Sequence, residues 1–205
     1  GTINFSSAGG VPDRSSPHTV PLSGSELTAG VHDGIDLSAA PTLVSGASYN
    51  IAFSGIDSSG NASEPLLIGP LMFDNTPPVV AVTDPLQGSA VNHSQLSYEL
   101  SEALVSGTVT WAPAGGSPQV KTLSGSELSA GLYSSVTLTD APSLSDGTIY
   151  SVTFSGSDAA GNAMEEVTVT DVTFDTTPPK ISVDFRNSAP SRGLFNHNSP
   201  VGMTF

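Results

Sequence analysis

The residue types best suited to chemistry in this chain are the aspartates of two recurring motifs. The sequence FDNTPP around Asp74 recurs as FDTTPP around Asp175, and Asp-x-x-Gly-Asn occurs at Asp57–Asn61 and at Asp158–Asn162. Carboxylate and amide oxygens are the ligands that Ca²⁺ prefers. The same residues also form tight turns and cap backbone bends, so the motifs by themselves leave a cation site and a local turn both open.

Other kinds of site find little support. The chain has no cysteine, which excludes disulfides and thiolate metal sites. Serine is abundant, but no Gly-x-Ser-x-Gly elbow stands in a strand-to-helix setting. We therefore predict that the protein is not an enzyme.

The charge balance limits the partners. The 205 residues include 19 acidic and 5 basic side chains, for a net charge of −14. Binding to nucleic acid or to an anionic membrane depends on Lys and Arg, so we expect no nucleic-acid partner and no direct membrane insertion. Divalent cations are compatible with this charge, although acidic residues can also serve solubility alone.

The elements that must position these aspartates are repeated. LSGSEL occurs at Leu22–Leu27 and at Leu123–Leu128, and a spacing of 101 residues is kept from Leu22 to Pro78. Gly1–Phe5 matches Gly107–Trp111 upstream. We predict three parts: residues 1–75, a partial repeat without its first two strands A and B; residues 76–177, a complete repeat; and residues 178–205, strands A and B of a third. Because the first residue is Gly, we expect a piece of a longer protein.

Alternating apolar residues predict strands in the complete repeat. The expected strands are Val79–Thr83, Gln95–Leu100, Gly107–Ala112, Gln119–Leu123, Ser135–Thr139, Thr148–Ser157 and Glu165–Phe174. In the last strand the alternation changes phase near Thr170–Asp171, which predicts a bulge.

About seven strands in about 100 residues is typical of an immunoglobulin-like or fibronectin type III-like sandwich. Gly147–Tyr150 and its counterpart Gly46–Tyr49 resemble the tyrosine corner of those folds. The predicted fold class is therefore all-β, a rod-like series of immunoglobulin-like sandwich repeats. We expect Trp111, which is matched by Phe5, to lie in the core.

The order Gly-x-x-Tyr, strand, Asp-x-x-Gly-Asn, strand, Phe-Asp-x-Thr-Pro-Pro resembles the tandem bacterial Ig-like repeats of giant surface adhesins, over essentially the entire chain. The resemblance implies an extracellular location at the bacterial cell surface and a role in long stalks. It also implies joints between repeats that are stiffened by Ca²⁺ bound to aspartates.

A physical argument places one such site in this chain. In a sandwich of this kind the B–C and F–G loops lie at the end where the preceding linker enters. Asp74 should therefore approach Asp158 and Asn162, with Glu102 nearby, and these four residues are the candidate Ca²⁺ ligands. Asp57, Asn61 and Asp175 are incomplete equivalents.

Two further hypotheses about function stay open. In the first, the A–B strands of one chain complete the partial repeat of another and form a filament, with Val201, Met203, Phe205 and Phe5 at the contact. The same boundaries would also result from dividing a continuous repeating fibre at a B–C loop. In the second, the chain is a carbohydrate-binding module. The expected partners are neighbouring repeats or identical chains, with any cell-surface or matrix ligand bound through other domains.

Overall fold

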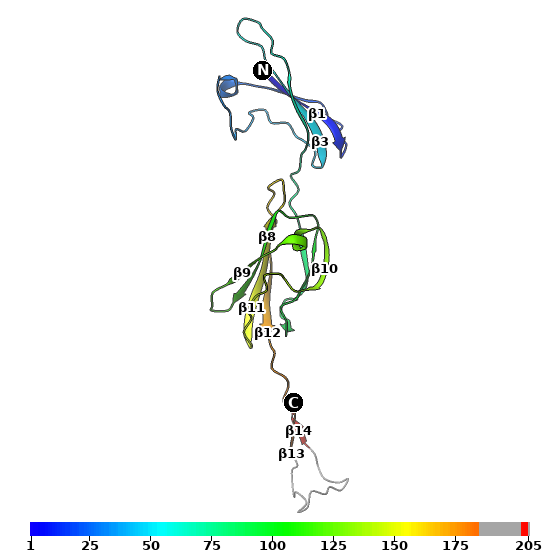
Figure 1. Ribbon diagram of the computed structural model, residues 1–205, viewed down its shortest axis with the longest axis vertical. Helices are drawn as coiled ribbons and strands as arrows, with labels where there is room; N and C mark the ends of the chain where they lie inside the picture. Colours follow the sequence, from blue (N-terminus) through cyan, green and yellow to red (C-terminus); the bar gives the residue numbers. More distant parts are fainter. Residues whose placement is uncertain (185–201, 205) are drawn as a thin grey trace, which may run out of the picture.

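The computed structural model describes residues 1–184 and 202–204, in which β-strands are the dominant elements. Figure 1 shows an elongated molecule with a β-sheet at the N-terminal end, a two-layered sandwich in the middle and a pair of short strands at the other end. The helical elements of the described part are two four-residue 3-10 turns, η1 (Gly24–Leu27) and η2 (Gly125–Leu128). Neither is long or apolar enough to span a bilayer.

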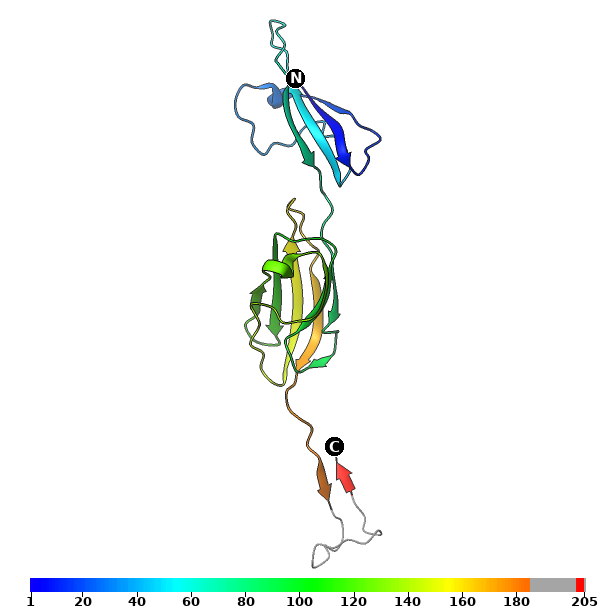
Figure 2. The same cartoon turned by 45° about the vertical axis from the view of Figure 1, so that its right-hand side comes forward.

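The sandwich consists of two antiparallel layers, with one short parallel strand added at an edge. One sheet has the order β10-β7-β5, and the other has the order β6-β12-β11-β8-β9. The strand bounds are β5 Val80–Asp84, β6 Ala90–Val91, β7 Leu96–Leu100, β8 Ser106–Pro113, β9 Gln119–Thr122, β10 Gly131–Val136, β11 Thr148–Ser157 and β12 Val167–Phe174. Figure 2 shows the two layers facing each other. The all-β, immunoglobulin-like prediction is confirmed.

Most predicted strands agree with these bounds to within two residues, but two predictions need correction. The strand expected at Ser135–Thr139 lies at β10, four residues earlier, because its pairing with β7 begins at Gly131 opposite Leu100. The short strand β6, which pairs in parallel with the end of β12, was not predicted.

The bulge predicted in the last strand is present. Register shifts between the pairs Tyr150–Val172 and Val152–Val169, and Asp171 between them has a φ of 60°. The left-handed backbone conformation of Asp171 allows Val172 to point into the core although the alternation has changed phase.

A continuous apolar core lies between the two sheets. Tyr98 from β7 packs on Phe154 from β11 with ring centroids 5.5 Å apart, and Trp111 meets Tyr150 edge-on at 5.9 Å. The Tyr150 hydroxyl accepts a hydrogen bond from the Ser145 backbone N–H at 2.9 Å, which forms the predicted tyrosine corner. The buried members are Val80, Leu96, Tyr98, Leu100, Leu104, Val109, Trp111, Leu123, Leu138, Tyr150, Val152, Phe154, Met164 and Val172.

The N-terminal sheet consists of β1 (Thr2–Gly10), β2 (His18–Pro21), β3 (Ala47–Ser54) and β4 (Leu66–Met72), in the order β2-β1-β3-β4. Ile3 pairs with Phe53, as Val109 pairs with Phe154 in the sandwich. The sheet thus reproduces the β9-β8-β11-β12 part of the sandwich. In residues 1–75, all of which the structure describes, no second sheet faces it.

The strand pair at the other end is β13 (Ser182–Asp184) with β14 (Gly202–Thr204), antiparallel. Of the residues predicted to mediate strand exchange, Met203 lies in β14, whereas Val201 and Phe205 lie outside the described residues. Phe5 lies in β1 and is half-buried.

Candidate metal site at the Thr-Pro-Pro joint

The joint between β4 and β5 is held by local hydrogen bonds. Asp74 Oδ1 accepts the backbone N–H of Thr76 at 3.0 Å and the hydroxyl of Ser45 at 3.1 Å. The Ser45 hydroxyl also lies 2.9 Å from Thr76 Oγ1. Asp74 therefore caps a backbone bend, as the local-turn interpretation expects, and one of its carboxylate oxygens is already engaged.

The second joint is built in the same way with a different partner. Thr177 donates its backbone N–H to Asp175 Oδ1 at 2.9 Å. Asp146, at the position that matches Ser45, accepts hydrogen bonds from the Thr176 and Thr177 hydroxyls at 2.9 and 2.7 Å. Sequence reasoning missed Ser45 and Asp146. The only signal for them is their shared place directly before the glycine that opens the tyrosine corner.

The Asp-x-x-Gly-Asn motif forms a closed loop between β11 and β12. Asp158 Oδ1 accepts the backbone N–H groups of Ala160 and Asn162 at 2.9 and 2.8 Å, and Asn162 Nδ2 donates to Asp158 Oδ2 at 2.8 Å. Gly161 has a φ of 93°, which favours glycine at this turn. These contacts fix the Asp158 carboxylate, whose residue is only 3% exposed.

Asn162 connects this loop to the joint. Its Nδ2 also donates to the Asp74 backbone carbonyl at 3.3 Å. The amide of Asn162 thus presents its nitrogen to both aspartates, and a nitrogen of this kind does not coordinate a cation. In this arrangement Asn162 is a positioning residue between Asp74 and Asp158.

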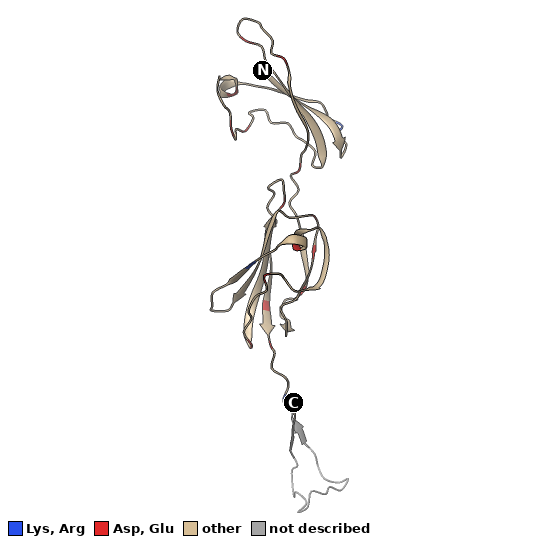
Figure 3. Cartoon of the chain, in the orientation of Figure 1, with Lys and Arg blue, Asp and Glu red and all other residues tan. Residues whose placement is uncertain are grey.

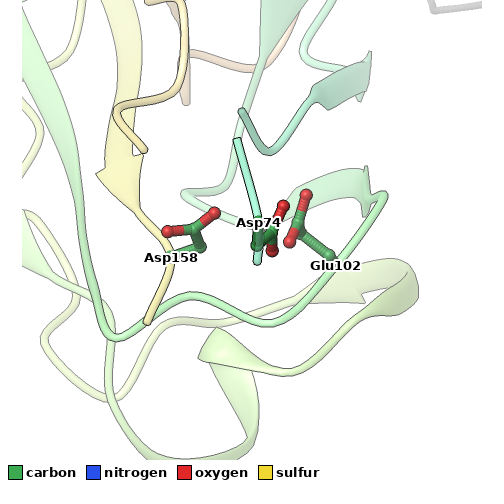
Figure 4. Close-up of side chains that lie close together, drawn as sticks. All are labelled: Asp74, Glu102 and Asp158. Atoms are coloured by element: carbon green, nitrogen blue, oxygen red, sulfur yellow. The ribbon is translucent and has the colours of Figure 1, made fainter. Parts of the chain in front are cut away.

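Three carboxylates converge at the joint. Asp74 from the linker, Glu102 from the β7–β8 loop and Asp158 from the loop after β11 each offer an oxygen, all within 4.8 Å of one another. Figure 4 shows these side chains reaching toward a common space from three separate segments. Within the part of the chain that the structure describes, this is the one group of three or more His, Cys, Asp or Glu side chains so arranged.

Burial and like-charge repulsion make it unfavourable for all three carboxylates of the cluster to be ionised together. Burial raises the pKa of Glu102, and the charges of Asp74 and Asp158 raise it further. The hydrogen bond from Asn162 acts in the opposite direction on Asp158 and lowers its pKa. Basic residues are few along the molecule (Figure 3), and neither ion pair of the described residues includes a member of the cluster. Among the described residues, no basic side chain therefore pairs with the cluster.

The donor set fits a hard divalent cation. Calcium–oxygen distances are about 2.3–2.6 Å, so two oxygens on one Ca²⁺ lie at most about 5 Å apart, which is consistent with the 4.8 Å limit here. Glu102 accepts no hydrogen bond in the described part of the chain, which leaves both of its oxygens available. The cluster lacks the nitrogen and sulfur ligands that zinc prefers.

The incomplete equivalents do not form such a cluster. Asp57 Oδ1 accepts the backbone N–H groups of Ser59 and Asn61, and Asn61 Nδ2 donates to Asp57 Oδ2. This loop has the same shape as the one at Asp158, but it is exposed, and no linker among the described residues reaches it. Loop geometry therefore does not by itself indicate a ligand.

A sugar-stacking surface at Trp111 is not available, because its side chain is fully buried.

A family profile described as a bacterial Ig-like domain matches residues 74–176, from the first joint to the second. A search among curated proteins found no match.

Proposed function

The chain belongs to the bacterial Ig-like domain family, and from that membership we propose that it is a structural module in the stiff extracellular stalk or fibre of a large bacterial surface protein. Domains of this family are generally non-catalytic and usually lie on the cell surface or outside the cell. Residues 1–75, 76–177 and 178–205 are then successive parts of a repeating rod. Its partners are neighbouring repeats, and adhesive contacts are made by other domains.

The observation that carries this proposal is the joint at Asp74. A linker that leaves one sheet is fixed to two loops of the next sandwich, through the Asn162–Asp74 hydrogen bond and the approach of the linker carboxylate to Glu102 and Asp158. Proline at positions 77 and 78 restricts the backbone of the same segment. A joint held in these ways transmits orientation from one unit to the next.

Ca²⁺ is the proposed cofactor of this joint. It would join the linker to both loops through the carboxylates of Asp74, Glu102 and Asp158, while Asn162 holds two of these residues in place. Burial is the main reason that the pKa of Glu102 is raised, and binding would relieve the like-charge repulsion that raises it further. Because a bound cation couples segments from both sides of the joint, it would limit bending there.

Glu102→Gln is the sharpest test, because the Glu102 side chain accepts no hydrogen bond from the described residues that the substitution would disturb. Without Ca²⁺ the variant should be at least as stable as the wild type, since one of three crowded charges is removed. Calorimetric titration should nevertheless show at least tenfold weaker Ca²⁺ binding. Stabilisation by saturating Ca²⁺, which follows from binding to the folded state, should shrink in parallel.

Asp57→Asn is the matched control. Asp57 forms the same loop but lies outside the cluster, so its Ca²⁺ binding should equal that of the wild type. A wild-type chain that binds no Ca²⁺, or a Glu102→Gln variant that binds it unchanged, would overturn the cation site.

A further inference from the structure

Three asparagines of this chain stand in the motif Asn-x-Ser, which is the acceptor motif for N-linked sugars when x is not proline. They are Asn4, Asn61 and Asn92, in residues 4–6, 61–63 and 92–94. A motif of three residues arises easily by chance in a chain rich in serine, so the sequence alone gives it little weight. The structure separates the three, because a sugar can be attached only where the amide nitrogen and its backbone are accessible to an enzyme.

Asn4 is held inside a sheet. It lies in β1, which pairs with β2 on one side and with β3 on the other. Its Nδ2 donates to Thr19 Oγ1 at 3.1 Å, and its Oδ1 accepts the hydroxyl of Ser6, the serine of the same motif, at 2.9 Å. Both ends of the amide are therefore engaged, and the backbone cannot leave the sheet without breaking its pairing with two strands.

Asn61 is exposed, but it is fastened to its own loop. Its Nδ2 donates to Asp57 Oδ2 at 2.9 Å, and its backbone N–H donates to Asp57 Oδ1 at 2.8 Å. The hydroxyl of Ser63, the serine of this motif, accepts the Gly55 backbone N–H at 2.9 Å. The acceptor amide and the motif hydroxyl thus both have structural roles, and an enzyme would have to open the loop before it could use Asn61.

Asn92 is the acceptor that no contact of this kind restrains. It directly follows β6, lies in the bend before β7 and is exposed. Within the part of the chain that the structure describes, neither its side-chain amide nor the Ser94 hydroxyl makes a hydrogen bond. The backbone of residues 92–94 makes none to these residues either. The segment can therefore take the shape that an enzyme imposes on it without losing a hydrogen bond.

A hollow beside Asn92 has room for the first sugar. It has a volume of about 380 Å³, and its wall includes His93 and Ser94, the two residues that follow the acceptor asparagine. A sugar ring presents hydroxyl groups at its rim and C–H groups on its faces, so it suits a surface of mixed polarity. The rest of the wall has this mixed character, with Gln95, Thr137, Pro142, Leu144 and Phe174.

We propose that Asn92 carries an N-linked sugar in the native protein. A separate glycosyltransferase would form the bond between Asn92 Nδ2 and the anomeric carbon of a sugar supplied as an activated sugar phosphate. The bond between that carbon and the phosphate oxygen breaks, the phosphate leaves with the electron pair, and the amide nitrogen gives up one proton. No oxidant or reductant takes part. The site is independent of the Asp74 cluster, because none of the three carboxylates lies in this loop.

The position of Asn92 would give the sugar a role at the second joint. The Asp175 backbone N–H donates to the Val91 carbonyl at 2.9 Å, so the residue before Asn92 is bonded directly to that joint. An attached sugar is bulky and hydrated, and it would shield the exposed residues 175–180 from proteases. This consequence rests on the proposed extracellular function, whereas the attachment itself requires only the accessible motif. Limited proteolysis should cleave residues 175–180 more slowly in modified than in unmodified protein, and equal rates would remove the shielding role.

The decisive test uses the protein isolated from the cells that produce it. Peptide mapping by mass spectrometry should find the added mass of a sugar on the peptide that contains Asn92, and on neither the peptide with Asn4 nor the peptide with Asn61. Electron-transfer fragmentation, which leaves the sugar in place, should locate it on Asn92. Native protein in which Asn92 is unmodified would overturn the proposal.

A second test asks whether the fold selects the acceptor. The purified full chain is incubated with a soluble glycosyltransferase that recognises Asn-x-Ser and with a nucleotide-activated hexose. The folded chain should gain hexose at Asn92 alone, whereas peptides from a digest of the same chain should be modified at all three motifs. Equal modification of the three asparagines in the folded chain, or modification of Asn92 in the peptides only, would contradict the selection by the fold.

Matched variants separate the motif from a general effect on the protein. Asn92→Gln and Ser94→Ala should both abolish the modification, and Ser94→Thr, which keeps the hydroxyl, should retain it. Because these side chains make no hydrogen bond within the described residues, the variants should fold. Asn61→Gln is the control and should be modified like the wild type. Ser94→Ala protein that is still modified at Asn92 would show that the motif is not what the enzyme recognises.

Discussion

At the residue scale, the role of each aspartate in this chain depends more on its neighbours in space than on the motif that contains it. Asp57 and Asp158 accept equivalent hydrogen bonds within equivalent loops. Only Asp158 lies beside a linker aspartate and a glutamate from another loop. The same turn is therefore purely structural at one position and part of a candidate cation site at the other.

Asp13, in the loop between β1 and β2, shows a third use of a carboxylate, as an anchor that ties this loop to β2 and β3. Its Oδ2 accepts hydrogen bonds from His18 Nε2 at 2.6 Å and from the Tyr49 hydroxyl at 2.7 Å. These two contacts lower the pKa of Asp13 from 3.8 to about 2. A carboxyl group whose pKa is depressed on folding stabilises the fold above its unfolded pKa and loses that effect as pH falls through its folded pKa.

Asp13→Asn should therefore destabilise the N-terminal sheet in a pH-dependent way. The difference in the free energy of unfolding between wild type and variant should be constant above about pH 4. It should disappear as the pH falls toward about 2. This difference can be measured by urea titration, with the NMR amide signals of β1 and β3 as the probe of unfolding. Asp33→Asn, an exposed position, is the control, and a gap that persists unchanged at pH 2 would contradict this role of Asp13.

At the element scale, identical segments reach different structures because their partners differ. The 3-10 turns η1 and η2 share the sequence GSEL and the same capping box. Glu127 in η2 is buried and also accepts the Thr139 backbone N–H at 2.6 Å. Burial acts to raise the pKa of Glu127, but the backbone donors of Thr139 and Ser124 hold it below its ordinary value. Glu26 in η1 makes the matching bond to Ser38 while half-exposed.

Glu127→Ala should lower the stability of the sandwich by about 2 kcal/mol, because the backbone N–H groups of Ser124 and Thr139 lose a charged acceptor. Trp111 is the single tryptophan and lies in the sandwich core, so its fluorescence in denaturant reports on this unit alone. Glu26→Ala removes the matching carboxylate from the N-terminal half and should leave the Trp111 transition unchanged. Equal shifts in both variants would show that the two units do not unfold independently.

At the scale of the whole molecule, the structure is a line of units connected by short joints. The Thr-Pro-Pro segments limit backbone freedom, and Ser45 or Asp146 fastens each segment to the loop before the tyrosine corner. Pro78 is fully buried, whereas Pro77 is exposed. Pro77 therefore affects the joint chiefly through its restricted backbone.

Pro77→Gly should make the molecule bend more, because glycine frees the backbone at that position and relaxes the restriction on Thr76. Small-angle X-ray scattering of this variant in chelator should show a broader distance distribution with a shorter mean than that of the wild type. Pro118→Gly, in the exposed β8–β9 turn, should leave the distribution unchanged. If the two glycine variants scatter alike, the joint is not stiffened by this proline.

The sequence by itself determined what is local or periodic in this protein. Strand β11 and the bulge near Asp171 follow from alternation, and the tyrosine corner and both Asp-x-x-Gly-Asn loops follow from short-range turn chemistry. The tertiary structure decided what depends on distant neighbours: that Asn162 points its nitrogen at Asp74, that Asp13 bonds Tyr49, and that residues 30–35, which match β10, form no strand. Contacts of this kind join residues far apart in the chain, and whether a strand or a cluster forms is settled only when its partner is in place.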